Sequence, residues 1–210
     1  MAYDACTPQT RRSDVDTDGN DRRAGRGSRA LHLGVTGHRS LEHEDEIRRQ
    51  INLAIDVALT PRSADSRSGA RRDLVVVSAL AEGADRLVAQ ECLRRDGATL
   101  TAVLPLAVER YEEDFATAAS RAEFADLLAR AAEVQLAEPM PTRDQAYERA
   151  DQMVVEQSDI VIAVWNGLGA AGRGGTADTV AFAHTRGVPV IRIDSRNLER
   201  HARPKGVQAP

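Results

Sequence analysis

The stretch from Asp159 to Phe182, DIVIAVWNGLGAAGRGGTADTVAF, places the strongest constraint on the fold. A continuous apolar run over 160–165 breaks into a glycine-rich loop, and the loop ends where a helical pattern begins. A buried strand that leads through a loop into a helix is the repeating unit of parallel α/β sheets. Glycines let the backbone approach a ligand closely, and the free N–H groups at a helix start attract an anion. The stretch therefore predicts a phosphate site at the carboxyl end of a strand.

The same alternation runs through most of the chain. Apolar runs predict strands at 31–37, 74–77, 100–104, 134–136, 160–165 and 188–193. Helical spacing predicts helices at 41–58, between 85 and 95, and at 109–116, 121–132, 143–157 and 177–185. This order indicates an α/β fold with a Rossmann-like, doubly wound, mostly parallel sheet in a single domain. Ligands of such sheets bind at the carboxyl ends of the strands, near the topological switch point.

Both ends of the chain lack this pattern. Residues 1–29 mix Arg and Asp with Gly and Ser and have no apolar periodicity, which predicts a disordered tail. The predicted domain covers residues 30–195, and residues 196–210 form a polar C-terminal tail. Residues 60–72, rich in Ser, Arg, Gly and Pro, predict a flexible loop inside the domain.

Composition excludes several classes of function. The net charge of −4 over 210 residues supplies no basic field for nucleic acid or an anionic membrane. Lys205 is the only lysine, so no glycine loop has the lysine that a P-loop requires. The apolar runs are too short to span a membrane, and the polar N-terminus has no secretory h-region. Cys6 and Cys92 predict no disulfide, and a cytoplasmic location follows. No Cys/His cluster has metal-ligand spacing, so we expect no metal and no required cofactor.

Polar residues follow the first predicted strand directly. They are Thr36, Gly37, His38 and Arg39. Gly37 permits a tight turn, while His38 and Arg39 can meet an anionic ligand, Arg39 in bidentate fashion. The alternative is a turn glycine followed by solvated polar side chains.

Two further strand ends supply candidates. Glu82, Gly83 and Asp85 follow the second strand, where the carboxylates could accept hydrogen bonds from ribose hydroxyls. Asp85 could instead complement the dipole of the following helix. After the third strand, Tyr111 and Phe115 share one helix face, either as a packing pair or as a lid that stacks on a base.

The glycine loop after the fifth strand completes the predicted binding site. Its residues are Gly172, Arg173, Gly174, Gly175 and Thr176. Thr176 can offer its hydroxyl and its backbone N–H together at a helix start. The loop does not match G-x-G-x-x-G with a following ribose-binding acid, which disfavours a conventional NAD dehydrogenase.

Four motifs carry a resemblance to a known family. They are GVTGHR at 34–39, SALAEGADR at 78–86, LP with the later YEEDF at 104–115, and SDIVIAVWNG…GRGGTADTVAFA at 158–183. Together they resemble bacterial members of the SLOG superfamily of Rossmann-like nucleotide-binding domains, over about residues 31–194. This superfamily joins the DNA-loading proteins of bacterial transformation to the lonely-guy phosphoribohydrolases. The resemblance implies binding of a nucleotide or a nucleotide-derived ligand such as ADP-ribose, and several relatives serve as sensor domains.

The phosphoribohydrolase branch of that superfamily carries PGGxGTxxE, whose Glu assists cleavage of an N-glycosidic bond. Gly175 and Thr176 keep the GT of this motif, but Thr179 occupies the position of the Glu. Asp178 stands one residue early, which on a helix rotates its side chain by about 100°. The family's catalytic carboxylate is therefore missing from its place.

Other residues could still supply glycosidase chemistry. Arg149 corresponds to the upstream Arg of the phosphoribohydrolase branch, since Met153 follows it at the family's spacing. A carboxylate that positions water or stabilises an oxocarbenium-like centre could come from Asp178, Glu82 or Asp85. The catalytic candidates are thus Asp178, Glu82 and Arg149, with Asp85 as a further carboxylate.

Three functions remain open at this point. The favoured one is a non-catalytic sensor that binds a nucleotide-type small molecule at the carboxyl edge of the sheet. The alternative is an N-glycoside hydrolase, phosphoribohydrolase-like or deoxyribosyltransferase-like, that acts on nucleoside monophosphates. Binding of single-stranded DNA is disfavoured because the chain lacks a basic, aromatic stripe. Relatives often form dimers, so the chain is a candidate homo-oligomer, although the sequence has no exposed apolar stripe that indicates a dimer interface.

Overall fold

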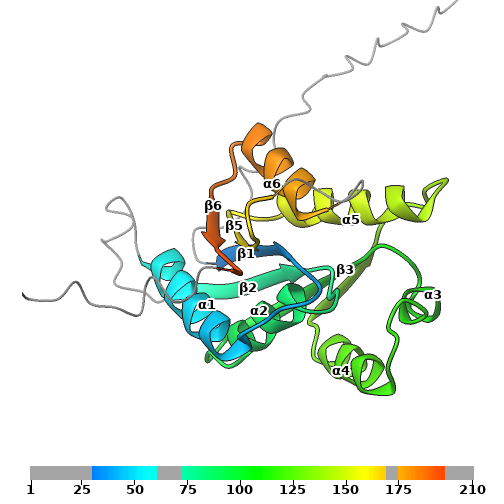
Figure 1. Ribbon diagram of the computed structural model, residues 1–210, viewed down its shortest axis with the longest axis horizontal. Coiled ribbons are helices and arrows are strands. Elements are labelled where there is room, and N and C mark those ends of the chain that lie inside the picture. The colour runs from blue at the N-terminus through cyan, green and yellow to red at the C-terminus, as the bar shows by residue number, and fades with distance from the viewer. Residues whose placement is uncertain (1–29, 61–71, 169–174, 197–210) are drawn as a thin grey trace, which may run out of the picture.

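A parallel β-sheet forms the centre of the protein (Figure 1). The computed structural model describes residues 30–60, 72–168 and 175–196. Within these ranges the strands are β1 (Ala30–Gly37), β2 (Asp73–Ser78), β3 (Thr99–Leu104), β4 (Glu133–Leu136), β5 (Ile160–Val164) and β6 (Val190–Ile193). The helices are α1 (Glu44–Leu59), α2 (Ala84–Leu93), α3 (Val108–Glu112), α4 (Ala118–Ala129), α5 (Arg143–Glu156) and α6 (Thr176–Thr185). The predicted Rossmann-like α/β fold is confirmed.

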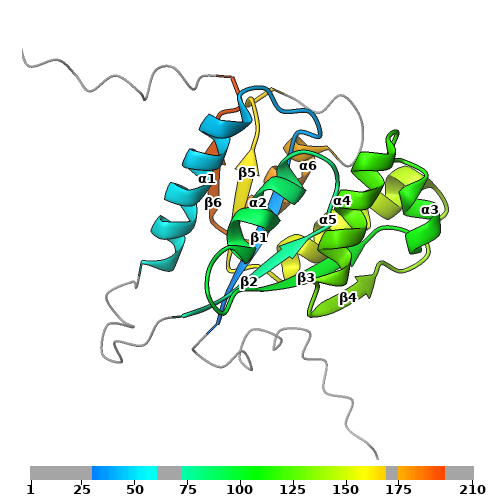
Figure 2. The same cartoon turned by 90° about the horizontal axis from the view of Figure 1, so that it is seen from below.

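The order of the strands locates the topological switch point. The sheet runs β4-β3-β2-β1-β5-β6, and every neighbouring pair is parallel. From β1 the chain adds β2, β3 and β4 on one side, then crosses to add β5 and β6 on the other, and Figure 2 shows β5 beside β1. The order therefore reverses between β1 and β5, the place where open parallel sheets bind ligands.

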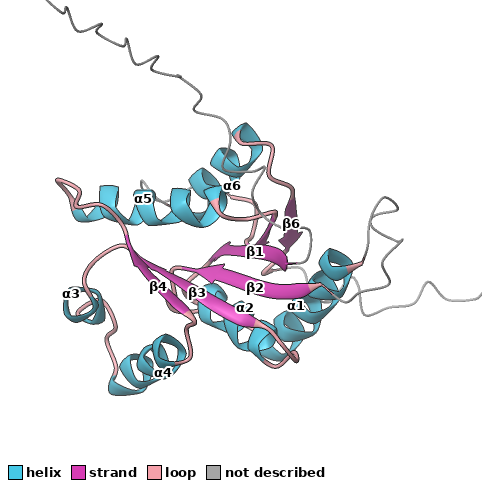
Figure 3. Cartoon of the chain, turned by 180° about the vertical axis from the view of Figure 1, so that it is seen from behind, coloured by secondary structure: helices cyan, strands magenta, loops and turns pink. Residues whose placement is uncertain are grey.

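Helices cover both faces of the sheet. Helices α1 and α2 lie on one face, and α5 and α6 lie on the other (Figure 3). Helix α4 packs against α2, and α3 and α4 lie together at the β4 end of the sheet. Because helices cover both faces, the inner strands are buried on both sides. This burial explains the continuous apolar run at 74–77 in β2.

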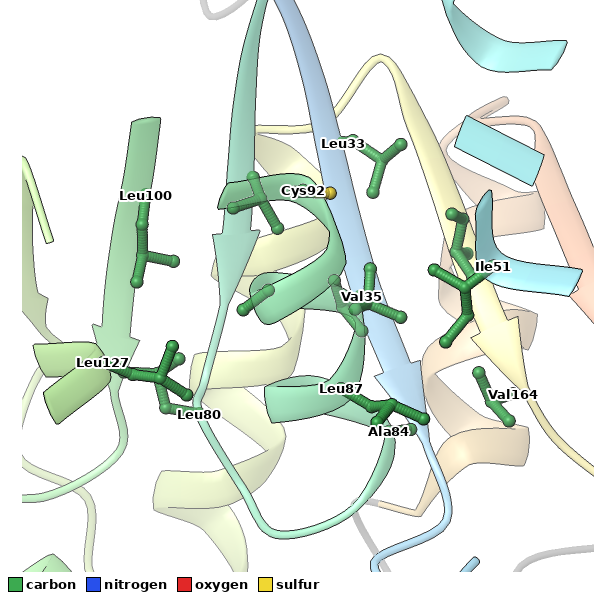
Figure 4. Packing of buried hydrophobic residues seen from close by; sticks show 14 of the residues in the cluster. Leu33, Val35, Ile51, Leu80, Ala84, Leu87, Cys92, Leu100, Leu127 and Val164 are labelled. Carbon is green, nitrogen blue, oxygen red and sulfur yellow. The ribbon is translucent and has the colours of Figure 1, made fainter. Parts of the chain in front are cut away.

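The larger core lies between the sheet and helices α1 and α2. Figure 4 shows Leu33 and Val164 of the sheet packed with Ile51 of α1 and Leu87 of α2. The helix predicted at 41–58 forms as α1, and its residues Ile47, Ile51, Ala54 and Ile55 are buried on one face. A fully buried aliphatic side chain stabilises the fold by roughly 1.5–3 kcal/mol, so this face holds α1 on the sheet.

The region after β3 differs from the prediction. Helix α3 ends at Glu112, earlier than the predicted 116, and Tyr111 and Phe115 are fully buried with their ring centroids 5.0 Å apart. The packing alternative for this pair is confirmed, and the lid that stacks on a base is wrong. Helix α4 begins before the predicted 121 because the Thr117 hydroxyl accepts a hydrogen bond from the Ser120 N–H at 3.0 Å and caps the helix.

Several sequence predictions fall outside the described residues. These include the tail at 1–29 with Cys6, most of the loop at 60–72, and residues 197–210. Cys92 is described and lies buried in α2. Burial raises the pKa of its thiol to about 12, so Cys92 is unreactive at neutral pH.

Candidate functional site at the carboxyl edge of the sheet

Loops from β1, β2 and β5 meet at the carboxyl edge of the sheet. The His38 N–H donates to the Val164 carbonyl at 3.0 Å, and the His38 carbonyl accepts from the Ala84 N–H at 3.0 Å. The His38 ring completes the junction, because its Nε2 accepts from the Asn166 N–H at 3.2 Å. An Nε2 that accepts leaves the ring proton of the neutral form on Nδ1. His38 thus ties three strand ends together.

Two of the predicted binding glycines let these loops pack closely. A Cβ atom at Gly37 would lie 2.4 Å from the Ala84 Cβ, so only glycine fits between β1 and the start of α2. Gly83 has a φ of +77°, and a Cβ there would lie 2.3 Å from the Arg39 carbonyl oxygen. Thr36 is buried within β1 opposite Ala163 of β5. These three residues let the loops after β1 and β2 pack closely at the carboxyl edge.

Arg39 is the exposed cation at this edge. Its guanidinium carbon lies 5.4 Å from the centroid of the Tyr147 ring, within cation–π range. Within the described residues, no salt bridge joins Arg39 to a carboxylate. The charge of Arg39 nevertheless reaches two aspartates, since it lowers the pKa of both Asp85 and Asp151. Arg39 is therefore an exposed cation at the carboxyl edge of the sheet, and its contact with an anionic ligand stays a prediction.

Asp85 lies in the first turn of α2 and is almost fully buried. Among the described residues, its carboxylate accepts a long hydrogen bond from the Ala81 N–H at 3.4 Å and also interacts with the Ser78 hydroxyl. Burial raises the pKa of Asp85 to about 7, and the Ala81 N–H and the charge of Arg39 counteract this only in part. Part of the Asp85 population is thus protonated at neutral pH.

Asp151 of α5 is the second carboxyl group of the edge, and it is half-buried. The Thr179 hydroxyl of α6 donates to Asp151 Oδ2 at 3.1 Å. Burial and the nearby charge of Asp85 raise the pKa of Asp151 to about 8. We call Asp85 and Asp151 the carboxyl pair. Burial of both groups, together with the charge of Asp85 on Asp151, favours the protonated form of the pair.

Two tyrosines border the carboxyl pair. The Tyr111 and Tyr147 ring centroids are 6.0 Å apart, and both buried hydroxyl groups lack a hydrogen-bond partner among the described residues. Burial raises the pKa of Tyr111, and the charges of Asp85 and Asp151 raise it further. Tyr111 is thus electrostatically coupled to both carboxyl groups.

The start of α6 faces the same edge. Gly175 is the N-cap residue, and its carbonyl accepts from the N–H groups of Asp178 and Thr179. Thr176 is the first helical residue and is half-buried. Its first-turn position carries the partial positive charge that favours an anion. The remaining loop candidates, Gly172, Arg173 and Gly174, lie outside the described residues.

Two of the predicted catalytic candidates lie in networks of their own. The Glu82 carboxylate accepts from the Ser120 hydroxyl of α4, and Ser120 is also bonded to the buried Arg86. Arg149 pairs with Glu138 at 2.7 Å and with Glu156 at 3.2 Å on the outer side of α5. The structure therefore does not bring these two side chains into contact with the carboxyl pair.

Asp178, the third predicted candidate, does reach the edge. It is exposed in the first turn of α6, and its charge contributes to the raised pKa of Asp151. Of the predicted residues, Arg39, Asp85 and Asp178 act on the charge of Asp151, and Thr176 begins the helix whose Thr179 donates to Asp151.

Sequence reasoning missed Asp151 and the two tyrosine hydroxyls. A usable signal was present, because Tyr147 and Asp151 are four residues apart and so share one face of the predicted helix. The phosphoribohydrolase motif instead points to Arg149, which lies on another side of the same helix.

The described residues limit other kinds of site. None of their His, Cys, Asp and Glu side chains form a group of three or more suited to a metal ion. None of the described helices combines the length and apolar character needed to cross a bilayer. No protein-family model matches the chain, and no curated protein sequence matches it either.

The edge combines groups of complementary chemistry. Arg39 and the start of α6 favour an anion, while the carboxyl pair and the tyrosine hydroxyls offer hydrogen bonds to neutral polar groups. A proton held on the pair reduces its repulsion of a neighbouring anion. The arrangement suits a ligand with both a phosphate and hydroxyl groups.

Proposed function

We propose that the protein binds a nucleotide or a nucleotide-derived ligand, ADP-ribose-like or a nucleoside phosphate, at the switch point between β1 and β5. Arg39 and the first turn of α6 hold its phosphate, and the carboxyl pair lies beside its sugar. The protein binds this ligand as a sensor module and does not catalyse its conversion, as its resemblance to the SLOG superfamily implies. The convergence of Arg39, the α6 start and the carboxyl pair at one strand edge carries this proposal.

A thermal-shift screen tests the binding. The full chain is heated with nucleoside monophosphates, NAD, ADP-ribose and cyclic nucleotides. A ligand at about 100 times its Kd stabilises the native state by about 2.7 kcal/mol, which raises Tm by several degrees. No shift with any of these ligands, confirmed by direct titration, would contradict the proposal.

Two variants connect that shift to the proposed site. Arg39→Ala is expected to weaken affinity by at least about tenfold, because it removes a charge-assisted contact to phosphate. The matched control is Arg130→Ala, whose side chain is partly exposed in a surface pair with Asp126 next to β4. The control is expected to bind like the wild type, and equal affinity of all three proteins would remove the site assignment.

An N-glycoside hydrolase is the second candidate, and the carboxyl pair favours it. Two carboxyl groups with pKa raised toward neutrality can supply an acid and a base in one site. Chromatography of the screening mixtures distinguishes the two functions. Intact ligand supports the sensor, whereas released base that disappears in Asp151→Asn and Asp85→Asn supports the enzyme.

Other aspects of the proposal come from the sequence. We expect a cytoplasmic protein with no membrane partner, no nucleic-acid partner and no required cofactor. A sensor output would have to come from a partner or from self-association, so a homo-oligomer belongs to the same proposal. Sedimentation of the protein with and without ligand tests this last point.

A further inference from the structure

The turn at residues 165–168 directly follows β5 and is closed by hydrogen bonds of its own. The Trp165 indole Nε1 donates to the Leu168 carbonyl at 2.8 Å, and the Leu168 N–H donates to Asn166 Oδ1 at 2.9 Å. Gly167 has a φ of +81°, a conformation that favours glycine. The turn is therefore a compact unit, and its position depends on its attachments to the neighbouring strands.

These attachments lie on both sides of β5. Toward β6, the Trp165 N–H donates to the Ile193 carbonyl at 2.9 Å, and the Arg196 guanidinium donates to the Asn166 carbonyl. Toward β1, the Asn166 N–H donates to His38 Nε2 at 3.2 Å. The attachment to β1 thus depends on an imidazole nitrogen, whereas the attachments to β6 have carbonyl acceptors.

The acceptor of the His38 bond exists only in the neutral ring. A neutral imidazole has one N–H and one bare nitrogen, but the charged ring carries a proton on both nitrogens. Histidine changes its charge between about pH 5 and 8, and His38 is only half-buried, so water can deliver the proton. A protonated His38 would point its Nε2–H at the Asn166 N–H, and two donors do not bond one another. Protonation therefore breaks the attachment of the turn to β1.

Charged and titratable side chains on the surrounding elements form the background of this titration. They are Arg39, Glu42 and His43 on its own segment, Glu82, Asp85 and Arg86 at the start of α2, Asp151 of α5, Asp178 of α6, and Arg192, Asp194 and Arg196 at the end of β6. Within the described ranges, no salt bridge joins His38 to any of the carboxylates among them. The pKa values of Asp85 and Asp151 are raised to about 7 and about 8, which overlaps the range of histidine. A substitution of His38 that leaves both carboxyl groups in place separates the two titrations.

We infer that His38 is a pH-sensitive latch, whose neutral ring fastens the turn at 165–168 to the β1 loop and whose protonated ring releases it. Because Arg39 directly follows His38, release loosens the edge at which the anionic ligand binds. This consequence for binding rests on the proposed function, but the latch itself does not. The sequence offers the opposite role, in which His38 contacts the anionic ligand and its charged ring strengthens binding in acid.

The indole of Trp165 reports the latch without any ligand. Trp165 is the only tryptophan of the chain, so its indole N–H gives one identifiable signal in a ¹H–¹⁵N NMR spectrum. In the full-length wild type this signal is expected to move as pH falls from about 8 to about 5. His38→Gln places an uncharged oxygen acceptor near the position of Nε2, so its signal should stay at the position that the wild type has at high pH. His38→Phe keeps a ring without an acceptor and should show the acid position at every pH.

The control is His184→Gln, which changes an exposed histidine in the last turn of α6 and should titrate like the wild type. If His38→Phe does not fold, the comparison of the wild type with His38→Gln still decides the outcome. A signal that does not move with pH, or that moves equally in His38→Gln, overturns the latch.

Binding of ADP-ribose tests the consequence for the site. The charge of its pyrophosphate is constant over this pH range, so any change in affinity comes from the protein. Calorimetric titration at about pH 7.5 and about pH 5.5 is expected to show that acid weakens binding about fivefold more in the wild type than in His38→Gln, the effect of one neutral hydrogen bond. Binding that acid strengthens in the wild type but not in His38→Gln overturns the consequence and assigns His38 to the ligand. No binding of ADP-ribose at either pH counts against the proposed function, while the indole signal still decides the latch.

Discussion

Helix α2 carries a buried carboxyl group near each end, and the two differ in their partners. Glu91 is 2% exposed and accepts from Arg48 at 2.7 Å and from Asn52 at 2.9 Å. Burial alone would raise its pKa, but these bonds outweigh burial and hold the pKa of Glu91 below its ordinary value. Asp85 is 6% exposed, has the long bond to Ala81, and has a pKa raised to about 7.

The difference separates a structural carboxylate from a functional candidate. Glu91 fastens α1 to α2, because its donors Arg48 and Asn52 lie on α1, while Arg94 donates from the end of α2. Asp85 is buried with a long hydrogen bond to Ala81, and the half-buried Asp151 accepts from Thr179, so neither has a salt-bridge partner like that of Glu91 among the described residues. Carboxyl groups with such raised pKa values gather at functional sites, and these lie at the ligand-binding edge of the sheet.

The largest effect on stability is expected from substitution of Glu91. Glu91→Ala removes the carboxylate that lies 2.7 Å from the partly buried Arg48 and should lower the free energy of unfolding by about 3 kcal/mol. Urea denaturation measures the loss. Glu44→Ala is the control, because this exposed carboxylate lies 3.9 Å from the same arginine and should cost less than about 0.5 kcal/mol. Similar losses in both variants would contradict the structural role of Glu91.

For Asp151, the contribution to the free energy of unfolding falls as pH rises. The folded-state pKa of Asp151, about 8, lies above its unfolded value of 3.8. The stability that its proton supplies is therefore complete below pH 3.8 and is lost as pH rises through 8. Asp151→Asn removes this loss, so relative to the wild type it should gain about 1–3 kcal/mol between about pH 5 and about pH 8.5.

Urea denaturation at a series of pH values measures this gain. Asp144→Asn serves as the control, since it removes an exposed carboxylate from the same helix and should shift stability equally at every pH in that window. If the Asp151→Asn curve ran parallel to the wild-type curve, Asp151 would titrate normally and the comparison with Glu91 would fail.

The smallest effect isolates one hydrogen bond. Thr179→Val keeps the side-chain volume but removes the hydroxyl that donates to Asp151. Because that bond favours the charged form, the pKa of Asp151 should rise further, and stability at about pH 9 should fall by about 1 kcal/mol. Carboxyl-carbon NMR titration reads the pKa directly, and an unchanged midpoint would show that the bond does not act on the charge.

Several features of the fold follow from local patterns. The apolar runs at β2 and β5 and the apolar face of α1 predict buried strands and a packed helix, because periodicity reports which side of an element faces the core. Helix ends were less certain, since the cap at Thr117 depends on one side-chain hydrogen bond. Arg39 and Thr176 were found for the same local reason, because each directly follows a strand or begins a helix.

The sequence by itself determined the alternating strands and helices, the sheet they build, and the cation and helix start at its carboxyl edge. Only the tertiary structure decided that the charge of Asp85 acts on Asp151, that Glu82 bonds to Ser120 of α4, and that Arg149 pairs with Glu138 and Glu156. The physical reason is that side-chain periodicity is local to one element. The rotation of α5 against α2 and α6, and the burial that raises a pKa, arise only when all three pack together.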